Sequence, residues 1–200
     1  MRIRTSAKRQ EILAIATETF IEMGYDRASM AEISTRVGGS KATLYGYFQS
    51  KEQLFLAVME SVGEEQVCLA FGELAREQGD IADALRRFGE RLINFLFQPT
   101  ALATQRVAIA EAGRSAIGRH FFDAGPRRGE ATVTAFMQTA MAAGQLREAD
   151  PLVAAQHLGA LLQAEFMPHC LFGVKVNLTR KHVRAAAARA VSVFMAAYGP

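Results

Sequence analysis

Hydroxyl and ammonium groups gather in one short stretch near the start of the chain, and this combination suits contact with a polyanion. They are the hydroxyls of Thr43, Tyr45 and Tyr47 and the ammonium groups of Lys41 and Lys51. If the stretch is a helix with Leu44 buried, a rotation of about 100° per residue directs Ala42 and Gly46 away from the core. Such small residues would let the helix backbone approach the floor of a DNA groove, where the flanking groups reach phosphates or base edges.

Two predicted helices joined by a glycine turn would hold this surface in place. Ser29 to Glu32 form a capping-box pattern that opens the first helix. Gly38-Gly39 ends it, and Ser40 caps the second helix, which runs from Lys41 to about Tyr47. The second helix would be roughly 10 Å long, close to the ~12 Å width of the DNA major groove. The spacing therefore predicts a helix-turn-helix.

A purely structural helical bundle is the competing interpretation of the same residues. In it, Tyr45, Tyr47 and Phe48 would be core aromatics, as aromatic residues at helical spacing usually are. The predicted directions weaken this interpretation, because Tyr45 and the core-facing Leu44 point about 100° apart and cannot both be central to one core.

The distribution of charge also singles out the N-terminal quarter of the chain. The 200 residues carry a formal net charge of +3 at pH 7. Residues 1–51 hold eight Lys or Arg, among them Arg2 and Arg4, against five Asp or Glu, whereas residues 52–200 hold fifteen of each kind. This asymmetry is typical of a polyanion-binding head on a neutral body, although a solvated surface with a basic N-terminal arm would show it as well.

Helical periodicity extends over nearly the whole chain, and no segment alternates as a strand would. Helices are predicted over residues 6–23, from Lys51 past Val62, from a cap at Asp80 through Leu96 until Pro99 ends it, and over 101–112, 116–124, 126–143, 151–171 and 179–197. We expect an all-α protein of nine or ten helices. Residues 1–51 would form a three-helix helix-turn-helix domain, and residues 52–200 a larger helical domain for ligand binding and dimerisation.

Several functional classes lack their sequence signatures. There is no apolar run of 18 residues to span a membrane and no signal-peptide core, so a cytoplasmic location, on the nucleoid when DNA is bound, is expected. Cys68 and Cys170 form no metal or disulfide pattern, and the four histidines show no metal-ligand spacing, so no cofactor or metal is expected. GxGxxG, P-loop, GxSxG and HExxH motifs are absent, and the adjacent His169 and Cys170 would point apart on a helix, so an enzyme is not expected.

A family resemblance rests on the motifs of the first quarter of the chain. They are Ile12-Leu13-Ala14, Phe20, Gly24-Tyr25, Ser29-Met30-Ala31-Glu32-Ile33 and the run from Gly38 to Phe55. With these fixed spacings, residues 9–56 resemble the DNA-binding domain of TetR/AcrR-type transcriptional regulators. Residues 108–112 and 121–126 more loosely resemble the AefR-like regulatory domain of some of these proteins. The resemblance implies a homodimer that binds a palindromic operator and holds a small molecule among its C-terminal helices.

The resemblance also assigns roles in DNA binding by motif position. It implies recognition-helix contacts from Lys41, Ala42, Thr43, Tyr45 and Tyr47, a phosphate contact from Lys51 and a DNA-backbone contact from Ser29. Ser40 and Gly46 complete the predicted surface. Two residues depart from the family pattern: Gly39 stands where a valine usually packs the turn, and Gly46 stands where a bulky residue is common.

A cavity for a small apolar or amphipathic effector is predicted between helices of the larger domain. Its candidate lining residues are Phe88, Leu92, Phe95, Ile109, Phe121, Phe136 and Met137, with Gln105, Arg114, His120 and Gln163 as polar anchors. Ordinary core packing explains the same apolar residues, and surface exposure or satisfied hydrogen bonds explain the polar ones.

The last two predicted long helices are apolar on more than one face, which predicts burial on more than one side. Their main stripes, assigned to a dimer interface, consist of Ala155, Leu158, Leu162 and Phe166 in one helix and Val183, Ala187, Ala190 and Phe194 in the other. A second copy packing as a four-helix bundle would cover the further faces. A monomer that uses both helices as ordinary core is the alternative.

Three functional hypotheses follow from these patterns. The preferred one is a repressor that holds its operator as a homodimer and is released by the effector. The second is a DNA-binding regulator of the same architecture whose C-terminal domain only dimerises. The third is an all-α enzyme or carrier, which would bind DNA no better than its charge predicts.

Overall fold

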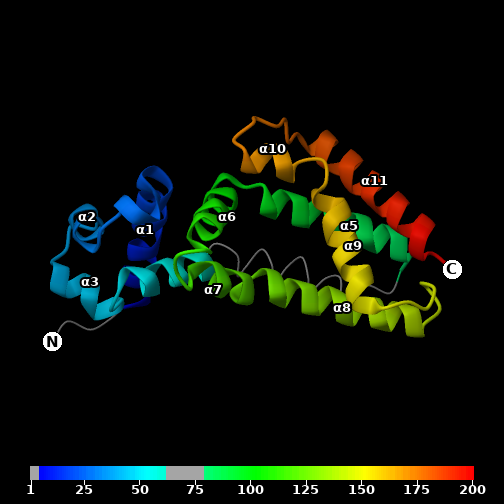
Figure 1. The fold of residues 1–200 in the computed structure, drawn as a ribbon, viewed down its shortest axis with the longest axis horizontal. Helices are drawn as coiled ribbons and strands as arrows, with labels where there is room; N and C mark the ends of the chain where they lie inside the picture. The colour runs from blue at the N-terminus through cyan, green and yellow to red at the C-terminus, as the bar shows by residue number, and fades with distance from the viewer. Residues whose placement is uncertain (1–4, 62–78) are drawn as a thin grey trace. The chain divides into compact units, whose positions relative to one another are not determined.

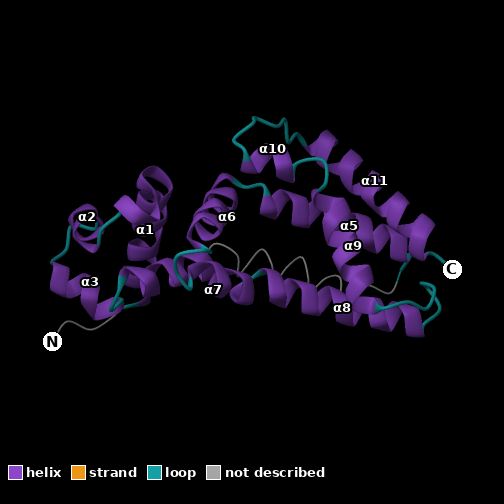
Figure 2. Cartoon of the chain, viewed as in Figure 1, coloured by secondary structure: helices purple, strands orange, loops and turns teal. Residues whose placement is uncertain are grey.

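The structure, a computed structural model, describes residues 5–61 and 79–200, and helices account for most of this part of the chain (Figure 1). Within it, Figure 2 shows helices and loops but no strand, so the all-α prediction is confirmed. None of the helices described is long and apolar enough to cross a membrane. The predicted features at Arg2, Arg4, Val62 and Cys68 lie outside the described residues.

The described chain forms two compact units. Unit 1 comprises described residues 5–61 and 99–124, with helices α1 (Ser6–Arg27), α2 (Met30–Arg36), α3 (Lys41–Tyr47), a helical segment over 51–61, α6 (Pro99–Glu111) and α7 (Ile117–Ala124). Unit 2 comprises described residues 79–98 and 125–200, with α5 (Ile81–Leu96), α8 (Pro126–Ala142), α9 (Pro151–Gln163), α10 (Met167–Leu171) and α11 (Arg180–Tyr198). The sequence predicts a boundary after residue 51 between a DNA-binding domain and a ligand-binding domain. That boundary divides the chain by function, and it stays a prediction.

Unit 1 is larger than a three-helix head because α6 and α7 share its core. Ile117 of α7 is fully buried in the same cluster as Ile12, Leu13 and Leu44, and Val107 and Phe121 pack against that cluster. An aromatic group anchors the other end of the core. The ring of Phe55 lies edge-on to those of Phe20 and Tyr25, with centroids 5.0 and 5.2 Å apart. These contacts join segments that lie far apart in the sequence.

Helix α1 continues beyond its predicted end. Gly24 has φ of 75°, a left-handed conformation that favours glycine, and it was expected to end the helix. The chain instead kinks there and adds one more helical turn, Tyr25–Arg27, and the Ala28 N–H closes that turn on the Gly24 carbonyl. The backbone of Tyr25 and Asp26 is thereby held at the edge of the core.

Hydroxyl side chains cap the helix starts of unit 1, and the caps at Ser29 and Ser40 were predicted. Thr5, Ser29 and Ser40 each accept a hydrogen bond from the backbone N–H three residues later. The capping box at Ser29 is closed on one side only, because the Glu32 carboxylate binds the Nε of Arg36 at 2.9 Å. Gly38, with φ of 67°, ends α2 in the left-handed conformation expected of the glycine turn.

Unit 2 is built around α11, which packs against α5 and α9, while α8 packs against α9. Its core contains the fully buried side chains of Leu85, Ile93, Leu158 and Phe194. Gly89 of α5 is required for this packing, because a Cβ at this position would lie 2.6 Å from a methyl carbon of Leu162. A larger residue at 89 would therefore force the Leu162 side chain to move.

One predicted helix, over residues 151–171, was wrong, and proline explains the break. The helix predicted over residues 151–171 is broken after Gln163, and α10 restarts at Met167. Pro168 has no N–H for helical pairing, and its ring clashes with a carbonyl four residues earlier, so it is tolerated only in the first turn of a new helix. Pro99 does not merely end α5, which already stops at Leu96, but is the first residue of α6.

Candidate nucleic-acid interface

Helix α3 has one buried face and one exposed face. Leu44 is 1% exposed and Phe48, its C-cap residue, is 3% exposed, whereas Tyr45 is 48% exposed. Lys41 and Ala42 are also exposed. The exposed face is the one that helical geometry directs away from Leu44, so α3 presents a surface rather than a second layer of core.

The hydroxyl of Thr43 is already used within the turn before α3. Ser40 Oγ accepts the Thr43 backbone N–H at 3.1 Å and lies 2.9 Å from Thr43 Oγ1. The Ser40 and Thr43 side chains therefore cap the helix together. Ser29, likewise exposed, uses its Oγ to cap α2.

Tyr47 connects α3 to the beginning of α1. Its hydroxyl oxygen accepts the backbone N–H of Thr5 at 3.0 Å, and its ring packs against the core of unit 1. The guanidinium of Arg9 lies 5.5 Å from the centroid of the Phe48 ring, which places a cation beside the end of α3. Neither contact could be predicted from local sequence spacing, because about 40 residues separate the two partners in each case.

Lys51, the lysine expected to contact a phosphate, is bound inside unit 1. Its Nζ donates to the carbonyl of Tyr25 at 2.9 Å, lies 3.4 Å from that of Asp26, and sits 4.2 Å from the centroid of the Tyr25 ring. Burial raises the pKa of the Tyr25 hydroxyl, and the carboxylates of Glu52, Glu111 and Asp26 raise it further. The Lys51 ammonium thus completes the turn after the α1 kink, a role that sequence reasoning missed.

The remaining predicted residues of α3 form a shallow, largely unpartnered ridge. Among the residues described, neither the Lys41 ammonium nor the Tyr45 hydroxyl has a hydrogen-bond or ion-pair partner. A Cβ added to Gly46 would meet no atom within 4 Å, so this position opens onto free space. The ridge therefore offers one cation, one phenol and two small residues to a partner.

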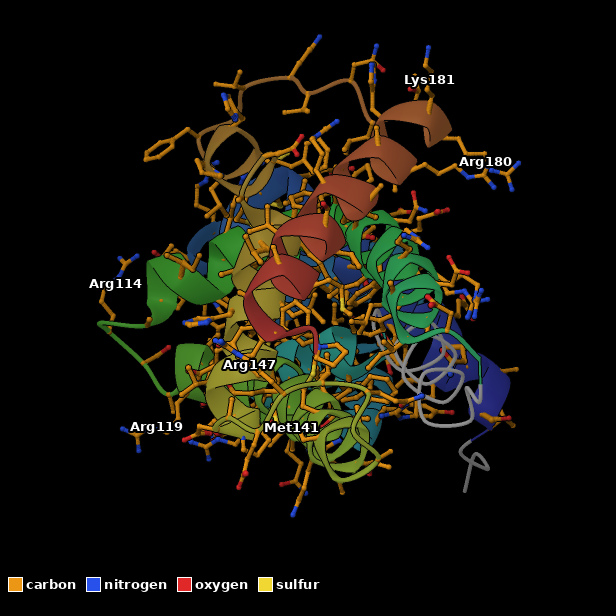
Figure 3. The ribbon with its side chains drawn as sticks, turned by 90° about the vertical axis from the view of Figure 1, so that its right-hand side faces the viewer. Arg114, Arg119, Met141, Arg147, Arg180 and Lys181 are labelled. Atoms are coloured by element: carbon orange, nitrogen blue, oxygen red, sulfur yellow. The ribbon has the colours of Figure 1, made fainter. Side chains whose placement is uncertain are left out.

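A second group of cations lies at the start of α11 in unit 2. Residues 166–200 contain five Lys or Arg and no Asp or Glu. Arg180 and Lys181 extend away from the ribbon there (Figure 3). This group is the natural comparison for Lys41, because its charges lie on a helix outside the predicted helix-turn-helix.

The predicted effector residues are divided between the two units. Gln105, Ile109, His120 and Phe121 belong to unit 1, and Phe88, Leu92, Phe95, Phe136, Met137 and Gln163 belong to unit 2. Phe88 and Met137 are buried, and Ile109 and His120 are exposed. An open hollow of about 460 Å³ in unit 1 lies between the end of α1 and α6, and of the predicted anchors only Arg114 lines it.

The eight residues assigned to a dimer interface are core residues of the single chain. Ala155, Leu158, Leu162, Phe166, Val183, Ala187, Ala190 and Phe194 are at most 6% exposed. The outward faces of α9 and α11 carry other residues, including Val153, Ala160, Ala188, Ser192 and Ala196, which are exposed. In the part of the chain that is described, no group of three His, Cys, Asp or Glu side chains could hold a metal ion.

Comparison with known families assigns both parts of the chain. The family described as "Bacterial regulatory proteins, tetR family" matches residues 12–58, and "AefR-like transcriptional repressor, C-terminal domain" matches residues 83–200. The HTH-type transcriptional activator FasR of Mycolicibacterium smegmatis is 42% identical over 59 residues, which are 30% of this chain and 27% of FasR. In the curated relatives the matched region spans between 27% and 36% of the relative's own length.

Solved structures resemble the whole chain. A TetR-family transcriptional regulator from Mesorhizobium loti MAFF303099 is 31% identical, with all of both chains aligned and a TM-score of 0.88. The flavonoid-responsive regulator FrrA is 27% identical over 98% of this chain and 99% of its own, with a TM-score of 0.74.

Proposed function

This chain belongs to the TetR family of bacterial regulatory proteins, and from that premise we propose that it is a homodimeric repressor that binds a palindromic operator and is released by a small effector. The family consists of transcriptional regulators rather than enzymes, so the enzyme interpretation is set aside. The protein would act in the cytoplasm, on DNA of the nucleoid. Repression rather than activation is favoured by the AefR-like repressor family that matches the C-terminal part.

The opposite burial of two neighbouring residues on α3 is the observation that carries the proposal. Leu44 is 1% exposed and Tyr45 is 48% exposed, so α3 is fixed by one face and free on the other. A free helix of seven residues with small central residues can enter a major groove. Lys41 and Tyr45 would then contact phosphates and base edges.

A homodimer is supported by the outward faces of α9 and α11. These faces carry exposed small or apolar side chains such as Val153, Ala160, Ala188 and Ala196. A second copy would cover them and form a four-helix bundle. A two-fold axis there would let two copies of α3 meet successive major grooves, about 34–36 Å apart.

An apolar or amphipathic effector is supported by the relatives and by the aromatic residues of unit 2. FrrA is by its name responsive to flavonoids, which are amphipathic aromatic molecules. Leu92, Phe95 and Phe136 are neither fully buried nor fully exposed and remain candidates for effector contact. Release from DNA requires an effector with different affinities for the two states, because equal binding shifts no equilibrium.

The second candidate is a regulator of the same architecture that senses no ligand. The low exposure of Phe88 and Met137, which the core accounts for without a ligand, favours it. It predicts that no compound from a library of amphipathic metabolites changes the affinity of the protein for its operator.

The test is capture of DNA by the purified full-length protein. Fragments of its own genome retained by the protein would be sequenced, and we expect a palindromic site with half-sites one or two helical turns apart. Tyr45→Ala should retain less of these fragments while its circular dichroism spectrum is unchanged. Retention without any common sequence, or equal retention by Tyr45→Ala, would overturn the proposal.

A further inference from the structure

Gly46 lies inside α3, yet neither the backbone nor the packing of the free protein requires a glycine there. Its φ is not positive, unlike those of Gly24 and Gly38, and a Cβ would meet no atom within 4 Å. Compared with alanine, a glycine inside a helix raises the equilibrium constant of unfolding by about two- to fivefold. Because the fold gains nothing in return, the reason for the missing side chain lies in what α3 binds.

The surroundings of Gly46 on the exposed ridge are apolar and shallow. Ala42, also exposed, lies four residues earlier and therefore in the same row of the helix surface. Of the three hydroxyls of α3, those of Thr43 and Tyr47 are engaged by Ser40 and Thr5, and that of Tyr45 has no partner among the described residues. Gly46 has no side chain, so the row has a gap next to the Ala42 methyl group and the Tyr45 side chain, and we call this gap the depression.

The major groove has one apolar group that projects from its floor, the C5 methyl of thymine. We infer that the depression at Ala42 and Gly46 receives a thymine methyl group in each half-site of the operator. This inference rests on the proposed function and names the base that its recognition helix selects.

The other bases fit the depression less well. Guanine presents two acceptors there, cytosine an amine donor, and adenine one of each. The N–H groups in the middle of α3 are used within the helix, so these base groups would lose water without gaining a partner, which is unfavourable. A methyl group needs no partner and gains from contact with Ala42.

The first experiment removes only the methyl group from the DNA. Once the operator is known from genomic capture, each thymine of a half-site is replaced singly by deoxyuridine, and the dissociation constant of the full-length protein is measured by fluorescence anisotropy. At one thymine position we expect binding to weaken by about fourfold, the effect of exposing one methyl group. If no replacement weakens binding by more than twofold, the inference is overturned.

The second experiment fills the depression from the protein side. Gly46→Ala should raise the urea midpoint of unfolding and weaken binding to the thymine operator by about five- to a hundredfold, as a mismatched base pair does. The same variant should bind better when that thymine is deoxyuridine, which is opposite to the wild-type preference. Unchanged affinity of Gly46→Ala, or an unchanged preference for thymine, would overturn the inference.

Gly159→Ala is the matched control, because Gly159 is also a glycine inside a helix. A Cβ at this position would have one neighbour within 4 Å, the side-chain nitrogen of Gln163 at 4.0 Å. The variant should raise the urea midpoint similarly, which measures the effect on stability of replacing a helix-interior glycine by alanine away from α3. A protein that binds no genomic site overturns the proposed function as well. A protein that binds its operator but is indifferent to deoxyuridine overturns only the thymine assignment.

Discussion

At the scale of single residues, the hydroxyl groups of α3 have separate tasks. Three side chains were expected to contact DNA through hydroxyls, but those of Thr43 and Tyr47 stabilise the helix-turn-helix itself. Tyr45 alone keeps an exposed phenol without a partner among the described residues. Substitutions at Thr43 or Tyr47 would therefore change both the stability of the protein and its affinity for DNA. A substitution at Tyr45 should change only the affinity.

Tyr45→Phe removes only the phenolic hydroxyl. We expect operator affinity to fall by about five- to tenfold, the effect of one lost hydrogen bond of about 1–1.5 kcal/mol, while the urea midpoint stays unchanged. Anisotropy titration and urea unfolding measure the two quantities. Leu44→Ala is the contrasting variant, because loss of this buried side chain should lower stability by about 2–5 kcal/mol. Equal affinity of Tyr45→Phe and wild type would remove the hydroxyl from the interface.

Lys41→Ala tests a phosphate contact. Affinity should fall for every DNA sequence alike, and the slope of log affinity against log salt should decrease by about one unit, because one fewer counterion is released. Lys181→Ala is the matched control, since Lys181 is an exposed lysine in the first turn of a helix that is not expected to enter a groove. If both variants change the slope equally, the charge of the whole molecule rather than α3 governs binding.

At the scale of elements, the turn after the α1 kink is held by Lys51. Lys51→Met keeps the aliphatic stem but leaves the carbonyls of Tyr25 and Asp26 without their donor. The free energy of unfolding should fall by about 1.5–3 kcal/mol, as for a hydrogen bond to a charged group. Urea unfolding measures this, with Lys175→Met, at an exposed loop lysine, as control. A variant with unchanged stability but a reduced salt slope would instead favour the phosphate contact that the family resemblance implies.

The break between α9 and α10 is fastened to α11 by an ion pair. Arg189 donates to both carboxylate oxygens of Glu165, at 2.8 and 2.6 Å, and this hydrogen bonding lowers the pKa of Glu165. Because the folded pKa lies below the unfolded value of about 4.3, the stabilisation is present above that pH and is lost as pH falls through the folded pKa.

Glu165→Gln should therefore lower the urea midpoint slightly at pH 7, since both partners are partly exposed, and the difference from wild type should shrink towards pH 3. Glu148→Gln, at an exposed glutamate outside the helices, should show no such trend. A difference that is constant from pH 7 to pH 3 would mean that charge pairing does not contribute.

At the scale of the whole molecule, association of two chains decides whether two copies of α3 act together. Ala160→Glu and Ala188→Glu place a carboxylate on the exposed faces of α9 and α11. Both should yield folded monomers with much weaker operator binding, because a two-fold interface would bury two like charges. Sedimentation velocity and anisotropy measure the outcomes.

Ala131→Glu is the control for association, because Ala131 is exposed on α8, outside the proposed interface. Phe194→Glu, suggested by the sequence stripe alone, would instead introduce a charge into the core of unit 2, where Phe194 is fully buried. Stable dimers of both Ala160→Glu and Ala188→Glu would refute an interface on these faces.

The sequence by itself determined the helical class, the caps at Ser29, Ser40 and Asp80, and the face of α3 that points outward. These features depend on residues within a few positions of one another, so local spacing and helix periodicity are enough to predict them. The family of the chain was predictable for the same reason, since its motifs lie in one continuous stretch.

Only the tertiary structure decided which polar groups remain free and which apolar stripes are already covered. Lys51 meets Tyr25 and Tyr47 meets Thr5, 26 and 42 positions away. Phe194 is fully buried in α11, which packs against α5 and α9 of the same chain. A stripe at helical spacing shows that a face will be buried, but it does not show against what, because burial against the same chain or a second copy requires the same apolar residues.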